Sequence, residues 1–312
     1  MKLKDLSENW LNKYAKHTIK LRTYITYKNI LEKHVLPVLG EYELEELTSS
    51  VIQDFVIFKA EKGNLNAKTG LTYNSINSIL AVLKQILKYA YNFKLILFDV
   101  VNDYKLPQIR EKQIDVFTNK ELQILENYCL NSKNNHIGIV ICLYTGIRIG
   151  ELLALTWDDI DFDKHLLSIN KNVCTLKIND KNVLHIDTPK TKSSMRVIPI
   201  PKQLIPYLRK IKKTSKSNYI ITTRNNTIVG TRAYQRSYER ILNKLNIKYR
   251  NFHSLRHTFA TRALELGMDV KSLSEILGHK DPSITLKRYS HSLLDYKIEM
   301  MNKLGKNINK KW

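Results

Sequence analysis

The chain has 312 residues, 43% of them hydrophobic, which suffices to bury a core in one large or two smaller domains and argues against an intrinsically disordered chain. Its 51 lysines and arginines exceed its 29 acidic residues, and the formal charge of +22 makes nucleic acid the first partner to consider. Charge alone does not decide this, because a lysine-rich composition inherited from an AT-rich genome explains it about equally well.

The basic excess is concentrated in the second part of the chain. Residues 1–112 hold 17 basic and 12 acidic residues, whereas the remainder holds 34 and 17, so phosphate should bind most strongly there. Three widely spaced cysteines without metal-binding spacing argue against a disulfide framework and fit a reducing compartment. The most apolar stretch, residues 137–147, is too short to cross a bilayer, and the N-terminus lacks a signal-peptide pattern. We therefore expect a cytoplasmic protein with no membrane partner.

Residues 1–106 predict a helical bundle that forms a first domain. Thr72 is placed to cap its second long helix. Pro37 and Gly40, in the segment VLPVLG, are expected to end the first long helix, because proline disfavours helical geometry in the residue before it. Apolar residues recur at helical spacing in both helices, namely Tyr24, Tyr27, Ile30 and Leu31, and Ile76, Leu80, Leu83 and Leu87.

The apolar periodicity lapses in a polar, proline-containing stretch, and residues 107–114 are expected to form an interdomain linker. A second domain, residues 115–312, follows. Thr118 and Glu121 have the spacing of a capping box at the start of its first helix. Residues 136–155 predict two buried helices broken near Thr145 and Gly146.

Between residues 160 and 200 short β-type runs alternate with Asn, Asp and Lys clusters, which predicts a small antiparallel sheet. The expected fold class is therefore mainly α with a small antiparallel β-sheet: a helical bundle followed by an α+β domain. Further helices are predicted over residues 202–213, 231–246, 254–266, 270–278 and 283–290. A final amphipathic segment carries the apolar residues Leu294, Ile298, Met301 and Leu304.

Clusters of polar residues fall where these helices begin or end. In TGIRIGEL, Arg148 opens an otherwise apolar helix after a glycine break, and Glu151 follows one turn later. In HSLRH, His253 and Arg256 would share one helical face and could bind one anion. His253 and His257 also have the spacing of a zinc helix, but the glutamate that this motif requires is missing, so we expect no metal.

A third cluster, LGHKDP followed by SITLKRYSH, contains His279 and Tyr289. Each residue alone is a weak signal, since a lone tyrosine among 17 is usually a packing residue. In order and spacing, however, the three clusters resemble the tyrosine recombinase or phage integrase family, which has an arginine in TGxRxxE, then HxxR, then LGH, then a tyrosine nine or ten residues later. The resemblance covers residues 113–291, and the helical region before it is similar to the family's SAM-like core-binding domain.

The resemblance implies that Tyr289 cuts one DNA strand and holds its 3′ phosphate covalently. The phenol needs a base or cationic surroundings, and His253 resembles the family residue with that task. Lys190, in TPKTKSSMRVIP, matches the family's hairpin lysine and would protonate the departing 5′ oxygen, with Lys192 as the alternative.

The same resemblance makes Arg148 and Arg256 a clamp on the nonbridging oxygens, a task that suits the planar, always charged guanidinium. His279 would donate a hydrogen bond to the phosphate. Glu151 resembles the acidic residue that orients the basic cluster, although a solvated helix charge explains it too. His257 and His291 are expected to have supporting or structural roles.

The implied partner is double-stranded DNA with inverted core sites, bound by a homotetramer, with an excisionase or a host architectural protein as further partners. No cofactor is implied, because exchanging a phosphodiester for a phosphotyrosine roughly conserves bond energy. A bacterial or phage gene and a nucleoid-associated enzyme are expected, and the last helix would dock on a neighbouring protomer or on its own chain. Candidate DNA contacts, each equally explained by a solvated surface, are Lys84, Lys192, Arg224, Arg232 and Arg236.

Several functions remain open within and beyond this resemblance. An integrase that integrates and excises a phage or conjugative element leads, because the segment around Lys190 resembles mobile-element integrases. A Xer-like resolvase of chromosome dimers competes with it. A type IB topoisomerase-like enzyme would share the phosphotyrosine step without synapsis, and a DNA-binding regulator would lack catalysis, which the complete residue set argues against. No additional small domain is recognised ahead of the core-binding bundle, which leaves accessory DNA sites unassigned.

Overall fold

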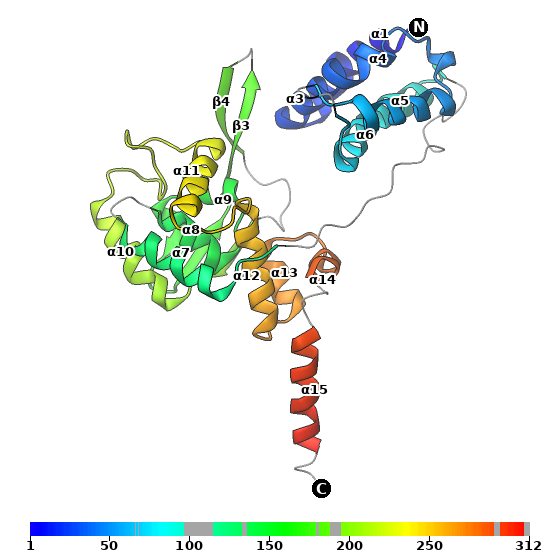
Figure 1. Ribbon diagram of the computed structural model, residues 1–312. Helices are drawn as coiled ribbons and strands as arrows, with labels where there is room; N and C mark the ends of the chain where they lie inside the picture. The colour runs from blue at the N-terminus through cyan, green and yellow to red at the C-terminus, as the bar shows by residue number, and fades with distance from the viewer. Residues whose placement is uncertain are drawn as a thin grey trace. The chain divides into compact units, whose positions relative to one another are not determined.

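The computed structural model describes residues 1–65, 67, 69–96, 115–132, 136–178, 181–187, 195–289 and 294–308. The chain divides into two compact units, residues 1–112 and 113–312, and each has a hydrophobic core of its own (Figure 1). The predicted linker, residues 107–114, lies outside the described residues. Within these ranges no helix has the length and apolar content that crossing a membrane requires.

The first unit is a helical bundle, which confirms that prediction. Its longest helices are α5 (Ser49–Lys62) and α6 (Tyr73–Asn92). The Thr72 hydroxyl accepts a hydrogen bond from the backbone N–H of Ser75 and so caps α6 as predicted. The preceding segments are α1 (Leu3–Asn9), η1 (Trp10–Ala15), α2 (Lys16–Thr18), α3 (Leu21–Ile30), η2 (Leu31–Val35), α4 (Leu36–Leu39) and η3 (Leu44–Glu46).

The first long helix ends within the VLPVLG segment as predicted, but it ends at Gly40, and the prediction that Pro37 contributes to this end is wrong. The helical path continues from α3 through the π-helical turn η2 into α4, and the chain leaves it at Gly40. Pro37 lies in the first turn of α4, where its fixed φ suits the helix. The residue four positions before it lies in the π-helical turn, whose wider winding relieves the clash that a proline ring causes in a regular helix.

The second unit begins with α7 (Asn119–Asn131), and the predicted capping box is present. Thr118 Oγ1 accepts from the Glu121 backbone N–H, and Glu121 Oε2 accepts from the Thr118 backbone N–H at 2.8 Å. The two predicted buried helices are α8 (Ile137–Thr145) and α9 (Ile149–Ala154). Gly146 ends α8 in the left-handed region, with φ of 63°.

The strands form two small antiparallel sheets rather than one. β1 (Ile160–Asp161), β2 (Leu166–Ile169) and β5 (Arg196–Pro199) form a three-stranded sheet in the order β1-β2-β5. β3 (Asn172–Ile178) and β4 (Lys181–Asp187) pair only with each other among the described strands. The chain therefore leaves the first sheet after β2, makes a hairpin, and returns to pair β5 with β2.

The remaining helices lie close to the predicted ranges. Among them, α12 packs against α8 and against α13, the next helix along the chain, so α12 lies between these two helices (Figure 1). The mainly α fold with small antiparallel sheets is confirmed. These elements are η4 (Trp157–Asp159), η6 (Lys202–Leu204), α10 (Ile205–Thr214), α11 (Thr231–Lys244), α12 (His253–Glu265), α13 (Val270–Leu277), α14 (Pro282–Tyr289) and α15 (Leu294–Ile308).

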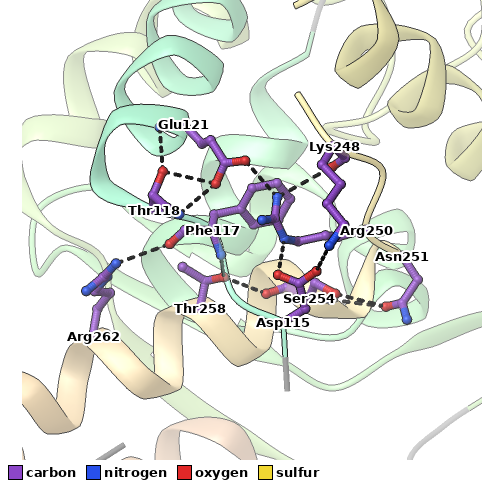
Figure 2. Close-up of polar contacts among 10 residues, drawn as sticks. All are labelled: Asp115, Phe117, Thr118, Glu121, Lys248, Arg250, Asn251, Ser254, Thr258 and Arg262. Carbon is purple, nitrogen blue, oxygen red and sulfur yellow. Dashed lines mark hydrogen bonds and ion pairs between the residues drawn. The ribbon is translucent and has the colours of Figure 1, made fainter. Parts of the chain in front are cut away.

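A polar network fastens the first described residues of this unit beside α12 (Figure 2). The Arg250 side chain, only 8% exposed, donates to Asp115 at 2.7 Å and to Glu121 at 2.9 Å. Its guanidinium carbon also lies 4.6 Å from the centre of the Phe117 ring. The Phe117 backbone N–H donates to the hydroxyl of Thr258 on α12 at 3.1 Å. The segment that enters the second unit is thus tied directly to α12.

Candidate active site

The polar clusters found in the sequence converge at the C-terminal end of α13. Gly278 ends that helix with φ of 65°, a left-handed conformation that favours glycine. Arg256, on α12, is 2% exposed and donates to the carbonyl of Leu277 at 2.8 Å. Its other terminal nitrogen donates to the carbonyl of Gly146, at the break between α8 and α9, at 2.8 Å. The guanidinium of Arg256 therefore bridges two helix ends.

Arg148 reaches the same helix end from the start of α9. Its Nη2 donates to the carbonyl of Gly278 at 3.2 Å, and its Nη1 lies 2.9 Å from Glu151 Oε1. The Glu151 carboxylate also accepts from the Arg148 backbone N–H at 2.9 Å, which closes a capping arrangement at the N-terminus of α9. The Arg148 side chain remains 39% exposed, so an anion in solvent can reach it.

His279 lies directly beside Arg256, with its Nε2 2.8 Å from Arg256 Nη2. Because a guanidinium nitrogen can only donate, Nε2 is the acceptor of this bond. The proton of the neutral ring is then on Nδ1, which donates to the Thr285 hydroxyl at 2.7 Å. Thr285 is fully buried on α14, so the ring of His279 is held between α12 and α14.

Arg196 belongs to this cluster, and sequence reasoning missed it. It begins β5, its side chain is only 7% exposed, and its Nη2 lies 2.9 Å from Glu151 Oε2. Burial raises the pKa of Glu151, but the hydrogen bond and charge of Arg196, together with Arg148, outweigh it and hold that pKa below its ordinary value. A signal was available: Arg196 has the same strand parity as the buried Ile198 and Ile200, so it points inward.

Of the other predicted catalytic residues, only His253 has a side chain that the structure describes. His253 is exposed at the start of α12, and its ring packs edge-on against His257 with centroids 4.6 Å apart. Tyr289 is the last residue of α14, and its side chain lies outside the described part of the chain. Lys190 and Lys192 also lie outside the described residues.

The candidate DNA contacts are dispersed over both units. Arg224 lies in an exposed turn before α11, and Arg232 and Arg236 are exposed one turn apart on that helix. Lys84 is half-buried on α6 of the first unit.

The family model described as "Phage integrase family" matches residues 115–295, more than half of the chain. The chain belongs to this family. A second model, "Phage integrase, N-terminal SAM-like domain", matches residues 2–59 of the helical bundle. The protein is thus a tyrosine recombinase, an enzyme that transfers DNA strands, with integrases of phages and mobile elements among its relatives.

Two curated relatives cover nearly the whole chain. A "Tyrosine recombinase XerC-like" protein of Caldanaerobacter subterraneus is 29% identical over 97% of this chain and 83% of its own length. The "Transposase from transposon Tn916" of Enterococcus faecalis is 27% identical over 94% of this recombinase and 74% of its own length.

Solved structures support the fold of this recombinase. The Tn1549 transposon integrase in complex with a circular intermediate DNA is 23% identical, with a TM-score of 0.82 over 97% of this chain and 99% of that chain. A lambda integrase tetramer bound to a Holliday junction is 18% identical, with a TM-score of 0.65 over 90% of this chain and 78% of that chain. At these identities the likeness concerns the fold.

Proposed function

We propose that the protein is the integrase of a mobile genetic element, a phage or a conjugative element, and that it cleaves and rejoins DNA through a 3′-phosphotyrosyl intermediate. The observation that carries the catalytic part is the meeting of Arg148 and Arg256, from separate helices, at Leu277 and Gly278. The relatives of integrase and transposon-transposase type support the role in a mobile element.

In the proposed cleavage step, the phenolic oxygen of Tyr289 forms a bond to phosphorus while the bond from phosphorus to the 5′ oxygen breaks. His253 takes the phenol proton, and Lys190 gives a proton to the departing 5′ oxygen. Arg148 and Arg256 neutralise the nonbridging oxygens, whose charge grows in the transition state. A 5′ hydroxyl from another strand reverses the step, so rejoining needs no nucleotide.

Supporting roles follow from the contacts around this cation pair. Glu151 orients Arg148 through the 2.9 Å contact between Nη1 and Oε1. His279 is proposed to donate a hydrogen bond to the phosphate from Nε2, the atom that accepts from Arg256 in the structure. For this change, either the Thr285 hydroxyl reverses and donates to Nδ1, or the ring takes up a second proton.

A suicide substrate, nicked so that the cleaved fragment diffuses away, tests the central claim. We expect the wild-type chain to form a covalent adduct in the presence of a metal chelator, and the Tyr289→Phe variant to form none while still binding DNA. Strand joining by Tyr289→Phe at the wild-type rate, or its abolition in the wild type by a chelator, would overturn the proposal.

The proposed assembly is a homotetramer on two duplexes with inverted core sites, in which α15 docks on a neighbouring protomer. Ile298, Met301 and Leu304 lie at helical spacing on α15 and are 53%, 67% and 52% exposed. The second unit offers a groove of about 760 Å³ between α7, α8, α12 and α13 that such a stripe would fit, and Leu266 on its rim is 88% exposed. Apolar surface of this kind is stabilised by burial against a partner. The apolar residues that line this groove include Leu143, Tyr144, Phe259, Leu266, Met268 and Ile276.

Assembly on DNA measures this docking directly. We expect Met301→Glu to weaken tetramer formation about tenfold or more, because a carboxylate loses its hydration against the apolar side chains that make up most of the groove. Asn302→Glu, which adds the same charge beside the stripe, is the matched control and should assemble normally. Unchanged tetramers after removal of all residues from Ser292 onward would refute docking in trans and favour packing of α15 on its own chain.

A Xer-like resolvase of chromosome dimers is the second candidate, because one of the relatives described above is XerC-like. Sequencing the DNA that the protein binds and cleaves separates the two roles. Core sites at the ends of a mobile element favour the integrase, whereas a single site in the chromosomal terminus favours the resolvase. An accessory excisionase or host architectural protein is expected only in the first case.

A further inference from the structure

Arg196 is a buried cation that contacts two segments of the candidate active site, the start of α9 and the C-terminal end of α13. It stands at the first position of β5, and the alternation of this strand directs its side chain to the buried face. The side chain is 7% exposed, compared with 39% for Arg148. Each of its three guanidinium nitrogens already donates to the Glu151 carboxylate or to the carbonyl of Ile276, so we seek its function in the groups that it contacts.

The guanidinium of Arg196 forms a fork on the carboxylate of Glu151. Nη2 lies 2.9 Å from Oε2 and Nη1 lies 3.3 Å from Oε1, while Nε donates to the carbonyl of Ile276 at 2.6 Å. Such a two-pronged bond fixes the plane of the carboxylate as well as its position. Since Arg148 Nη1 contacts the same Oε1 atom at 2.9 Å, the orientation of Arg148 depends on that plane.

Arg196 also packs directly on Gly278. A side-chain carbon added to Gly278 would lie 2.8 Å from Nη1 and 3.0 Å from Cζ of Arg196, so the absence of a side chain there permits the approach. The carbonyl of Gly278 is the second acceptor of Arg148, at 3.2 Å. Both described anchors of the Arg148 guanidinium, the Glu151 carboxylate and the Gly278 carbonyl, are therefore held by Arg196.

We propose that Arg196 is a positioning residue for strand cleavage, which presents the guanidinium of Arg148 to the scissile phosphate by fixing Glu151 and Gly278. This inference rests on the proposed function, in which Arg148 binds that phosphate. Arg196 also compensates the charge of Glu151, so that the carboxylate does not draw Arg148 fully into a buried ion pair. Arg148 then keeps N–H groups for the substrate.

The test compares two suicide substrates that differ only at the scissile group, one with an ordinary phosphate and one with a methylphosphonate, which carries no charge. On the phosphate substrate we expect Arg196→Met to form the covalent adduct about 100-fold more slowly, the effect of a small misplacement of a catalytic group. On the methylphosphonate the ratio of wild-type to variant rates should fall to about threefold or less, because little charge remains for Arg148 to neutralise. DNA affinity, set by many other phosphate contacts, should change about twofold at most.

Two further variants make the comparison decisive. Arg250→Met removes another buried arginine that is paired with carboxylates but lies outside the cluster, and it should change the rates on both substrates by the same factor. Arg196→Lys keeps the charge but loses the fork, and we expect it to be about tenfold slow on the phosphate alone. If thermal unfolding shows that Arg196→Met does not fold, Arg196→Lys carries the same comparison.

Equal slowing of both substrates by the Arg196 variants would mean a purely structural residue and would overturn the inference, as would wild-type rates on both. Arg148→Ala, measured in parallel, separates this failure from a failure of the proposed function. If Arg148→Ala also cleaves the phosphate substrate at the wild-type rate, Arg148 does not bind the scissile group, and the proposed function falls together with the inference. If Arg148→Ala is slow and Arg196→Met is not, the inference alone is lost.

Discussion

Removal of the Arg250 side chain should destabilise the second unit by about 2 kcal/mol. Arg250 is 8% exposed and contacts Asp115, Glu121 and the Phe117 ring. Asp115 is 47% exposed, and its Oδ2 still has the ion pair with Lys248 Nζ at 3.0 Å, so the loss of its bond to Arg250 costs little stability. Glu121 is only 21% exposed, and its charge-assisted bond contributes about 1.5 kcal/mol. The contact with the ring adds about 0.5 to 1 kcal/mol.

Hydrogen exchange in the full chain isolates this unit, because the slowest amides of α8 exchange only when its core opens. For Arg250→Met, a loss of about 2 kcal/mol corresponds to exchange about 30-fold faster than in the wild type. Arg209→Met is the matched control: Arg209 also has an acidic partner and an aromatic ring, but it is 53% exposed, so its loss should cost at most about 0.5 kcal/mol. Equal acceleration by the two variants would refute the reasoning from burial.

The same variant has a defined dependence on pH. The hydrogen bond from Arg250 lowers the pKa of Asp115. Burial raises the pKa of Glu121, but the Thr118 backbone bond and Arg250 outweigh it and lower that pKa below its ordinary value. A carboxyl group whose pKa is lower in the folded than in the unfolded state stabilises the fold at pH values above its unfolded pKa, which is about 4. This stabilisation disappears as the pH falls through the folded-state pKa. The difference between wild type and Arg250→Met should therefore stay constant from about pH 7 to 5 and shrink towards about pH 3.

Two substitutions probe the turn that carries the candidate site. Gly278→Ala should lower the stability of the unit by about 1 to 2 kcal/mol and slow adduct formation, because φ is 65° there and the new carbon would meet Arg196. Gly305→Ala, with nothing within 4 Å in α15, should be neutral or slightly stabilising in the same exchange and cleavage assays. Thr285→Val should slow adduct formation about tenfold by removing the hydroxyl that fixes His279, with DNA binding unchanged. Normal cleavage by Thr285→Val would mean that the imidazole needs no such support.

Sequence reasoning succeeded where the determining signal is local. The capping box at Thr118 and the break at Gly146 depend on residues within one or two turns, and both are present as predicted. The prediction of one sheet rather than two was wrong, because alternating apolar and polar residues identify strands but not the strands with which they pair. β2 pairs with β5 across an intervening hairpin of two strands, and that choice is made by distant contacts. The interpretation of Pro37 failed because the adjoining π-helical turn relieves the clash of its ring with the preceding turn.

The candidate site shows the same division between local motif and distant contact. The resemblance selected Arg148, Arg256 and His279 from their motifs, and the structure brings these residues to one helix end. Arg196 escaped notice because nothing in its own motif reveals that Glu151 lies opposite it. The partnership joins residues 45 positions apart through two different elements. The roles of Tyr289 and Lys190 stay predictions that the cleavage experiments address.

The three arginines of the cluster differ in what holds them, and this difference limits what each can do. Arg256, 2% exposed, donates to two carbonyls and an imidazole, so its plane is set before any substrate arrives. Arg196 directs two nitrogens of its guanidinium at the Glu151 carboxylate. Of the three arginines, only Arg148 has a side chain that is more than a third exposed. A phosphate that enters the proposed site would therefore contact Arg256, whose guanidinium is already fixed, and Arg148, whose exposed N–H groups it can bind. Lysine has no fork with which to bridge carbonyls or carboxylate oxygens, so an arginine-to-lysine exchange should cost activity at all three positions.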